Sequence, residues 1–230
     1  MVKLSEHQSK QIEVIKKIEK LFHQNKISAV QKVENYENDP RICLTSVHFP
    51  TKHLTKTILD KVINPLQKID DKVFYYPQES LHLTIKNVRT IDNPPNFKPR
   101  DLVTARQVFE KIVPKHRKFN VYYHKLVVYL NNLSLVCLTD PELDSIFLDL
   151  DKELNKVGLP DNKIYANRKY IISNITIARF YDSPSIKFKK AVENIPKLNI
   201  FDDYLIDDIT LLTANAAMKN KKIIGKWKLQ

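Results

Sequence analysis

The chain has 230 residues, of which 43% are hydrophobic and 28% charged, so it is not disordered as a whole and can bury a sizeable core. No stretch approaches the ~18 consecutive apolar residues of a membrane span, and the charged N-terminus does not resemble a secretory signal. Lys and Arg number 38 against 26 Asp and Glu, which favours an anionic partner such as RNA or a nucleotide. A lysine-rich surface without that role accounts for the charge as well, because the lysines form short, dispersed clusters.

Cysteine and glycine usage narrows the chemistry. Cys43 and Cys137 both lie among apolar residues of strand character. This indicates a reducing, intracellular environment, and we expect a cytoplasmic protein. Only two glycines occur, which excludes the glycine-rich phosphate loops of nucleotide-binding proteins. Any phosphate chemistry must therefore come from side chains that project from strands.

The chain opens with an amphipathic helix over residues 8–24, where Ile12, Ile15 and Ile18 share one face. We divide the chain into an N-terminal helical extension, residues 1–38, and a single bilobal domain, residues 39–230. In the first half of that domain a buried strand over 42–49 ends at Pro50, a helix follows over 54–66, and two strands lie within 73–89 on either side of a turn at Pro77.

A proline-rich segment over 91–100 predicts a crossing between two halves. A helix that Asp101 can cap comes next. It precedes an antiparallel hairpin over 119–139, whose turn at Asn131 and Asn132 suits positive φ. The strongest helical pattern covers 140–159. The remaining strand-like segments are 169–180, 204–214 and 221–230.

Two hexapeptides in these strands resemble each other: HLTIKN at 82–87 and NITIAR at 174–179. Each has a polar residue, an aliphatic residue, Thr and Ile in the same order. Side chains alternate along a strand, so His82 and Thr84 point to one face, and Asn174 and Thr176 do the same. Each strand therefore offers two polar groups to one surface.

These residues resemble the 2H phosphoesterases, and within them the 2′-5′ RNA ligase-like and RNA 2′,3′-cyclic phosphodiesterase branch, whose mark is two His-x-Thr/Ser motifs. The second motif of that branch often reads His-hydrophobic-Thr-Leu-Ala-Arg, so NITIAR is similar to it except at its first position, allowing Ile for Leu. The resemblance covers roughly residues 40–230. It implies an α+β, bilobal and pseudo-symmetric fold, with two antiparallel sheets forming a central groove and helices on the outside.

The resemblance also implies roles for individual residues. In the family the two histidines act as base and acid without metal or cofactor, because imidazole titrates near neutral pH. By position, His82 and Asn174 take the two catalytic places, and Thr84 and Thr176 hold phosphate oxygens. Arg179 binds phosphate through its fork of donors, provided that the strand ends or bulges before it. Lys86 is a further candidate for phosphate binding.

Asn174 departs from the family pattern, since an amide neither takes nor gives a proton at neutral pH. Three interpretations stay open: His82 works alone or with another group such as His48, His124 or a nearby tyrosine; the groove binds nucleotides without cleaving them; or this sequence carries an inactivating substitution. The leading hypothesis is a metal-independent phosphodiesterase acting on a 2′,3′-cyclic phosphate or a 2′-5′ linkage of RNA or a small nucleotide. The alternatives are a catalytically inactive nucleotide- or RNA-binding protein, and a vestigial groove whose N-terminal helix docks an unknown protein partner.

Overall fold

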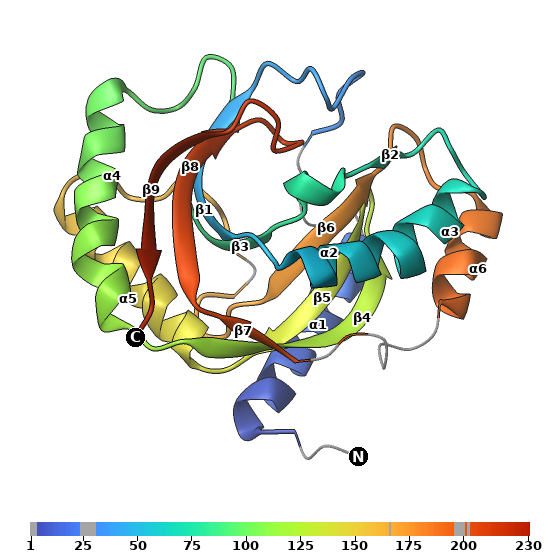
Figure 1. The fold of residues 1–230 in the computed structure, drawn as a ribbon, viewed down its shortest axis with the longest axis horizontal. Coiled ribbons are helices and arrows are strands. Elements are labelled where there is room, and N and C mark those ends of the chain that lie inside the picture. The colour runs from blue at the N-terminus through green and yellow to red at the C-terminus, as the bar shows by residue number, and fades with distance from the viewer. Residues whose placement is uncertain (1–3, 24–30, 166, 196–200, 202) are drawn as a thin grey trace.

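A computed structural model describes residues 4–23, 31–165, 167–195, 201 and 203–230. Its centre is a curled, antiparallel, nine-stranded sheet in the order β7-β4-β5-β6-β3-β1-β8-β9, with β2 paired to β6 (Figure 1). The strands are β1 (Ile42–His48), β2 (Phe74–Tyr75), β3 (Leu83–Asp92), β4 (Phe119–Val128), β5 (Asn132–Thr139), β6 (Ser173–Arg179), β7 (Tyr204–Ile206), β8 (Asp208–Ala214) and β9 (Lys222–Lys228).

Helices cover the sheet, and most of them share one large apolar core with it. That core joins apolar residues of five α-helices to one face of the strands. α5 contacts β3, α4 contacts β9, and α6 contacts β4. The helices are α1 (Glu6–His23), α2 (Lys52–Ile58), α3 (Asn64–Gln67), α4 (Pro99–Ile112), α5 (Glu142–Lys156) and α6 (Ile186–Asn194), with a π-helical turn at Leu59–Ile63 between α2 and α3.

The sheet has two halves related by a pseudo-twofold relation. Reading outward from its middle, β6, β5, β4 and β7 correspond to β3, β1, β8 and β9. β3 and β6 meet at the pair Leu83 and Ile175, so the two expected sheets are one continuous sheet joined at its centre. The bilobal α+β arrangement predicted from the two motifs is confirmed.

Most predicted elements are present, and the differences have local causes. Asp101 accepts the backbone N–H of Lys98 at 2.8 Å, as expected for a capped helix start. The hairpin turn is not built on positive φ at Asn131 or Asn132, because within the described part of the chain only Gly158, Met218 and Asn220 have it. α6, a nine-residue helix, was not predicted from the sequence, because a helix this short shows little apolar periodicity.

α1 is packed on the sheet. Ile15 lies in a second apolar cluster with Val127, Val136 and Leu138. These side chains point away from the large core, so α1 and α2 lie on opposite faces of β5 (Figure 1). The helix that the sequence placed in an N-terminal extension therefore packs on the sheet.

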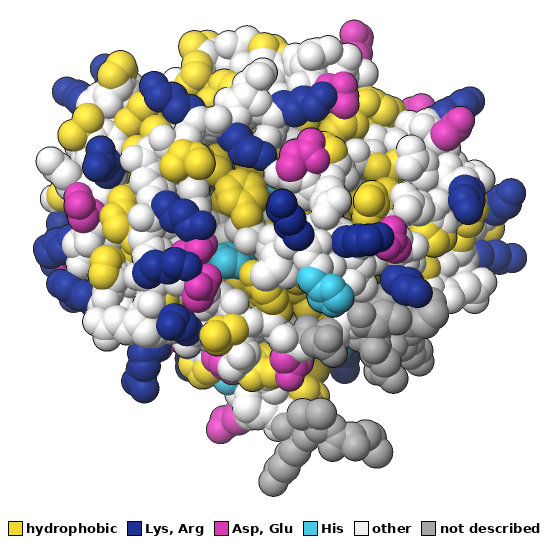
Figure 2. Space-filling model, viewed as in Figure 1, with side chains coloured by type: hydrophobic (Ala, Val, Ile, Leu, Met, Phe, Trp, Pro, Cys, Tyr) yellow, Lys and Arg dark blue, Asp and Glu magenta, His cyan; other side chains and the backbone are white. Residues whose placement is uncertain are grey.

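The surface carries dispersed charge. On the face seen in Figure 2, Lys and Arg side chains are spread over many elements and form no single basic patch. Both cysteines are free and buried. None of the helices that the structure describes combines the length and the apolar character needed to cross a membrane.

Candidate active site

The two hexapeptide motifs lie side by side at the centre of the sheet. Leu83 pairs with Ile175 across β3 and β6, and both are buried in the large core. In this antiparallel register His82 is the neighbour of Thr176, and Thr84 is the neighbour of Asn174. Cross-strand neighbours share a face, with Cβ atoms about 4.5–5.5 Å apart, so all four polar side chains point away from the core. We call this side of the sheet the motif face.

His82 is held in one tautomer. Its Nδ1 lies 2.8 Å from the carbonyl oxygen of Ser80, which can only accept, so Nδ1 carries the hydrogen and Nε2 keeps its lone pair. The pKa of His82 is lowered to about 4, mainly by burial; the Ser80 bond acts in the opposite direction, and the charges of Arg179 and Lys221 add to the lowering. At neutral pH this imidazole can accept a proton but has none to give at Nε2.

Asn174 belongs to a small polar network on β5 and β6. Its Nδ2 donates to Ser134 Oγ at 3.2 Å and lies 3.4 Å from Thr176 Oγ1. The Asn174 and Thr176 side chains are partly exposed, while Ser134 is buried. The amide is therefore oriented with its donor group on the motif face, where it can offer a hydrogen bond but no titratable proton.

A β-bulge returns Arg179 to the motif face. Thr176 pairs with Ser134 and Ala178 with Leu133, which leaves Ile177 as the extra residue. Ile177 and Ala178 are both in the core, so the next residue, Arg179, turns back to the motif face, as expected for a strand that bulges before it. Its Nε donates to the Tyr76 hydroxyl at 2.9 Å.

The same kind of bulge in β3 takes Lys86 away from the motif face. Thr84 pairs with Val47 and Lys86 with Ser46, so Ile85 is the extra residue. The Lys86 ammonium lies 4.0 Å from the Phe147 ring centroid, bonds Asp151 at 2.9 Å and also bonds Asp161. Its side chain is fully buried. Simple alternation failed here, and we leave Lys86 out of the candidate site.

Two residues beside the site were not individually identified from the sequence. Tyr76 packs with its ring centroid 6.2 Å from that of His82, and its hydroxyl bonds the Ala216 carbonyl as well as Arg179. Lys221 comes from the turn before β9 and donates to the Glu79 carbonyl at 2.8 Å. Neither residue belongs to a motif, and their positions depend on the packing of distant segments, so no sequence signal marks them.

His48 does not supply the second titratable group. It pairs in register with Leu83 and so faces the core side of the sheet. Its Nδ1 lies 2.8 Å from the Asp208 carbonyl and 3.1 Å from Asp208 Oδ1, and its Nε2 lies 2.8 Å from the Tyr204 hydroxyl. Both ring nitrogens are engaged.

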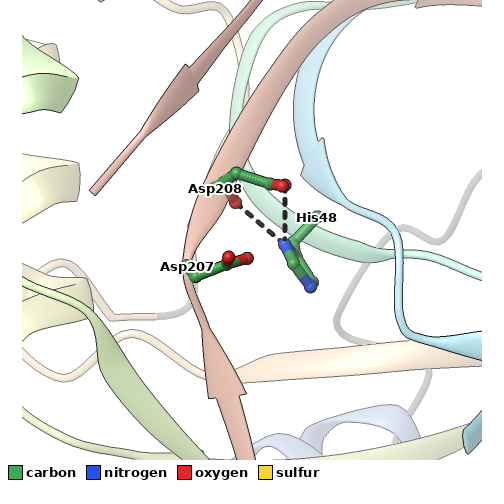
Figure 3. A group of neighbouring side chains, drawn as sticks. All are labelled: His48, Asp207 and Asp208. Carbon is green, nitrogen blue, oxygen red and sulfur yellow. Dashed lines mark hydrogen bonds and ion pairs between the residues drawn. The ribbon is translucent and has the colours of Figure 1, made fainter. Parts of the chain in front are cut away.

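His48, Asp207 and Asp208 place three ligand atoms within 4.8 Å of one another, a spacing that a metal ion could use (Figure 3). Two lysines already neutralise the carboxylates: Lys226 lies 2.9 Å from Asp208, and Lys228 lies 2.7 Å from Asp207. Burial would raise the pKa of Asp208, but hydrogen bonds from His48 and Lys226 outweigh it and lower that pKa. We interpret the group as a structural ion-pair network.

His124 lies elsewhere, beside α1. Burial lowers its pKa, and the charges that act on it are those of Lys125, Glu19 and Lys16. Of the groups considered as partners for His82, only the tyrosine Tyr76 is a neighbour of it.

Known proteins resemble this chain in structure. No protein-family model matches the chain, and no curated protein matches it in sequence. Escherichia coli LigT complexed with phosphate matches with a TM-score of 0.58 and 12% identity, over 83% of this chain and 98% of that chain. This chain has the fold of LigT. A conserved protein of unknown function from Agrobacterium tumefaciens matches with a TM-score of 0.57 and 12% identity, over 91% of this chain and 99% of that one.

Other structures with this fold carry ligands or related names. LigT has been crystallised with 3′-AMP, with ATP and with NADP+, and a structure described as a phosphoesterase matches with a TM-score of 0.56 at 12% identity. At such identities the likeness establishes the fold, and the role of each motif residue has to be argued from this chain's own geometry.

Proposed function

We propose that this protein is a metal-independent phosphodiesterase with reduced activity, acting on a 2′,3′-cyclic phosphate or a 2′-5′ linkage of RNA or a small nucleotide. The observation that carries the proposal is the meeting of His82, Thr84, Asn174 and Thr176 on one face of two adjacent strands. LigT-like structures that hold phosphate and nucleotides support a phosphate-bearing ligand. Arg179 supplies the cation at the end of the second motif.

His82 is the proton acceptor in this proposal. Its Nε2 takes a proton from the attacking water, whose oxygen bonds to phosphorus as the bond from phosphorus to the 2′ or 3′ oxygen breaks. Thr84, Thr176 and Arg179 hold the other phosphate oxygens. The departing oxygen takes its proton from solvent, because Asn174 can only donate a hydrogen bond to it.

Slow turnover follows from two features of the site. A pKa of about 4 makes His82 a weak base at neutral pH, and the acid that the family pattern expects is absent. General acid or base assistance contributes about 10²- to 10⁴-fold each. We therefore expect turnover well below that of a site with two histidines.

The test is hydrolysis of adenosine 2′,3′-cyclic phosphate and of 2′-5′ diadenylate in the presence of EDTA, by wild type and two motif variants. His82→Asn should lower the rate by about 10²- to 10⁴-fold, and Asn174→His should raise it within the same range. His53→Asn, at an exposed histidine of α2, is the matched control. A wild-type rate that His82→Asn leaves unchanged would contradict the proposal.

A second candidate is a nucleotide-binding protein without turnover. It is favoured by Asn174, which takes the place of the family's second histidine and whose amide donates to Ser134 Oγ. In that case the wild type binds 3′-AMP but shows no hydrolysis, and Asn174→His creates it. Binding of nucleic acid should then weaken with salt, as expected for phosphate contacts.

A further inference from the structure

α1 packs on the motif face. On β5, Ser134 and Val136 pair with Thr176 and Asn174, so these residues share a side of the sheet. Ile15 of α1 lies in an apolar cluster with Val136. The helix therefore rests on the strand next to the second motif, on the same side as its polar residues.

Specific contacts fix the helix there. Gln11 is fully buried; its Nε2 donates to Thr139 Oγ1 and to the Ile171 carbonyl, and its Oε1 accepts from the Thr139 backbone, all at 2.9 Å. His7 lies 2.7 Å from Asp144. At the other end, Glu19 lies 2.7 Å from Lys125 of β4. These hydrogen bonds and ion pairs hold α1 in a fixed position on the sheet.

Because a helix is wider than the spacing between two strands, α1 extends over the second motif. A helix is about 10–12 Å across with its side chains, whereas neighbouring strands are about 4.8 Å apart, so a helix on β5 reaches over β6. At 100° per residue, the flank opposite Glu19 carries Val14 and Ile18. Glu19 is turned to Lys125 of β4, so Val14 and Ile18 are turned to β6. Lys125 pairs with Val136, and Val136 pairs with Asn174, so we infer that Ile18, next to Glu19 in the helix, is level with Asn174.

The other rim of the motif face is built differently. Lys221 is exposed, and its ammonium lies 5.2 Å from the centroid of the half-buried Phe49 ring. A long, flexible lysine can move aside or bind an anion, whereas a packed helix cannot. A ligand bound at His82 therefore has more freedom toward Lys221 than toward α1.

We propose that α1 is a wall that selects the substrate, admitting a terminal 2′,3′-cyclic phosphate or a mononucleotide and disfavouring a 2′-5′ linkage. A cyclic phosphate has a nucleoside on one side only, but a 2′-5′ linkage has one on each side and needs space beyond Asn174. The inference rests on the proposed function and decides between its two substrate classes. Ile18 is the residue of the wall that determines specificity.

The test compares two ligands in binding, so that it does not depend on turnover. Calorimetry should show that the wild type binds 3′-AMP at least about tenfold more tightly than 2′-5′ diadenylate. Ile18→Ala should reduce that ratio by about tenfold, through tighter binding of the dinucleotide with the 3′-AMP affinity unchanged. Lys17→Ala, on the exposed side of α1, should leave both affinities unchanged.

The outcomes separate this inference from the proposed function. Equal wild-type binding of both ligands, or a parallel change of both affinities in Ile18→Ala, overturns the wall and leaves the phosphodiesterase proposal standing. Binding of neither ligand by the wild type removes the proposed function and the inference with it. If circular dichroism shows that Ile18→Ala does not fold, the wild-type ratio alone decides.

Discussion

The half of the sheet built on β3 and the half built on β6 share a backbone and differ in chemistry. In both motifs a buried isoleucine, Ile85 or Ile177, is the extra residue of a bulge directly after the motif threonine. Around this common backbone the first half carries His82 and the second half Asn174. The core fixes the isoleucines because both halves must bury them, whereas the residues on the motif face are free to change with function.

The residue directly after the bulge also differs between the two halves. Lys86 and Ala178 occupy equivalent places and both turn to the core side. The alanine packs among apolar residues, whereas the buried lysine forms ion pairs with Asp151 and Asp161. The next position turns back to the motif face, as Asn87 in the first half and Arg179 in the second. The arginine therefore lies in the half whose motif begins with Asn174.

The buried lysine gives the largest expected difference in stability between the halves. Lys86→Met should lower the free energy of unfolding by about 3–5 kcal/mol, because it leaves Asp161 buried without its cation. Urea denaturation measures the change. Lys111→Met is the control, since its pair with Glu153 is exposed on the lysine side and should contribute at most about 1 kcal/mol. Equal effects would show that the network around Lys86 is no stronger than a surface pair, and Lys86→Met with Asp161→Asn should recover part of the loss.

The histidine of the first half should make stability depend on pH. His82 has a pKa of about 4 in the folded protein and an ordinary value of 6.5, so between these values the unfolded chain binds more protons. Its contribution is present above pH 6.5 and is lost as pH falls through about 4, up to about 3 kcal/mol in total. His82→Asn makes the first half like the second and should flatten this dependence in urea denaturation at several pH values. The idea fails if His53→Asn flattens it as much.

The arginine of the second half should have the smallest effect. Arg179→Lys keeps the charge but loses the fork and the Nε bond to Tyr76, so binding of 3′-AMP should weaken by about tenfold in calorimetry. Asn87→Ala, at the equivalent place in the first half, should change it by less than about twofold. If the two variants weaken binding alike, binding of the phosphate does not depend specifically on the second half of the sheet.

Local patterns predicted much of this structure. The alternation in HLTIKN and NITIAR placed both motifs on strands with the threonines on one face, and the helical pattern over 8–24 predicted α1. Alternation failed after each bulge: Lys86, directly after Ile85, turned inward, and Arg179, two residues after Ile177, turned outward. A bulge is set by how two strands pair, so a single strand's pattern does not announce it.

What the sequence by itself determined is the type of most elements and the two motifs, because propensity and periodicity are local properties that each segment carries alone. Only the tertiary structure decided that His82 is buried in its neutral form, that Tyr76 and Lys221 stand beside it, and that α1 packs on the face of Asn174. Burial, electrostatic environment and shared faces are properties of pairs of segments far apart in the chain, and they exist only once those segments have packed together.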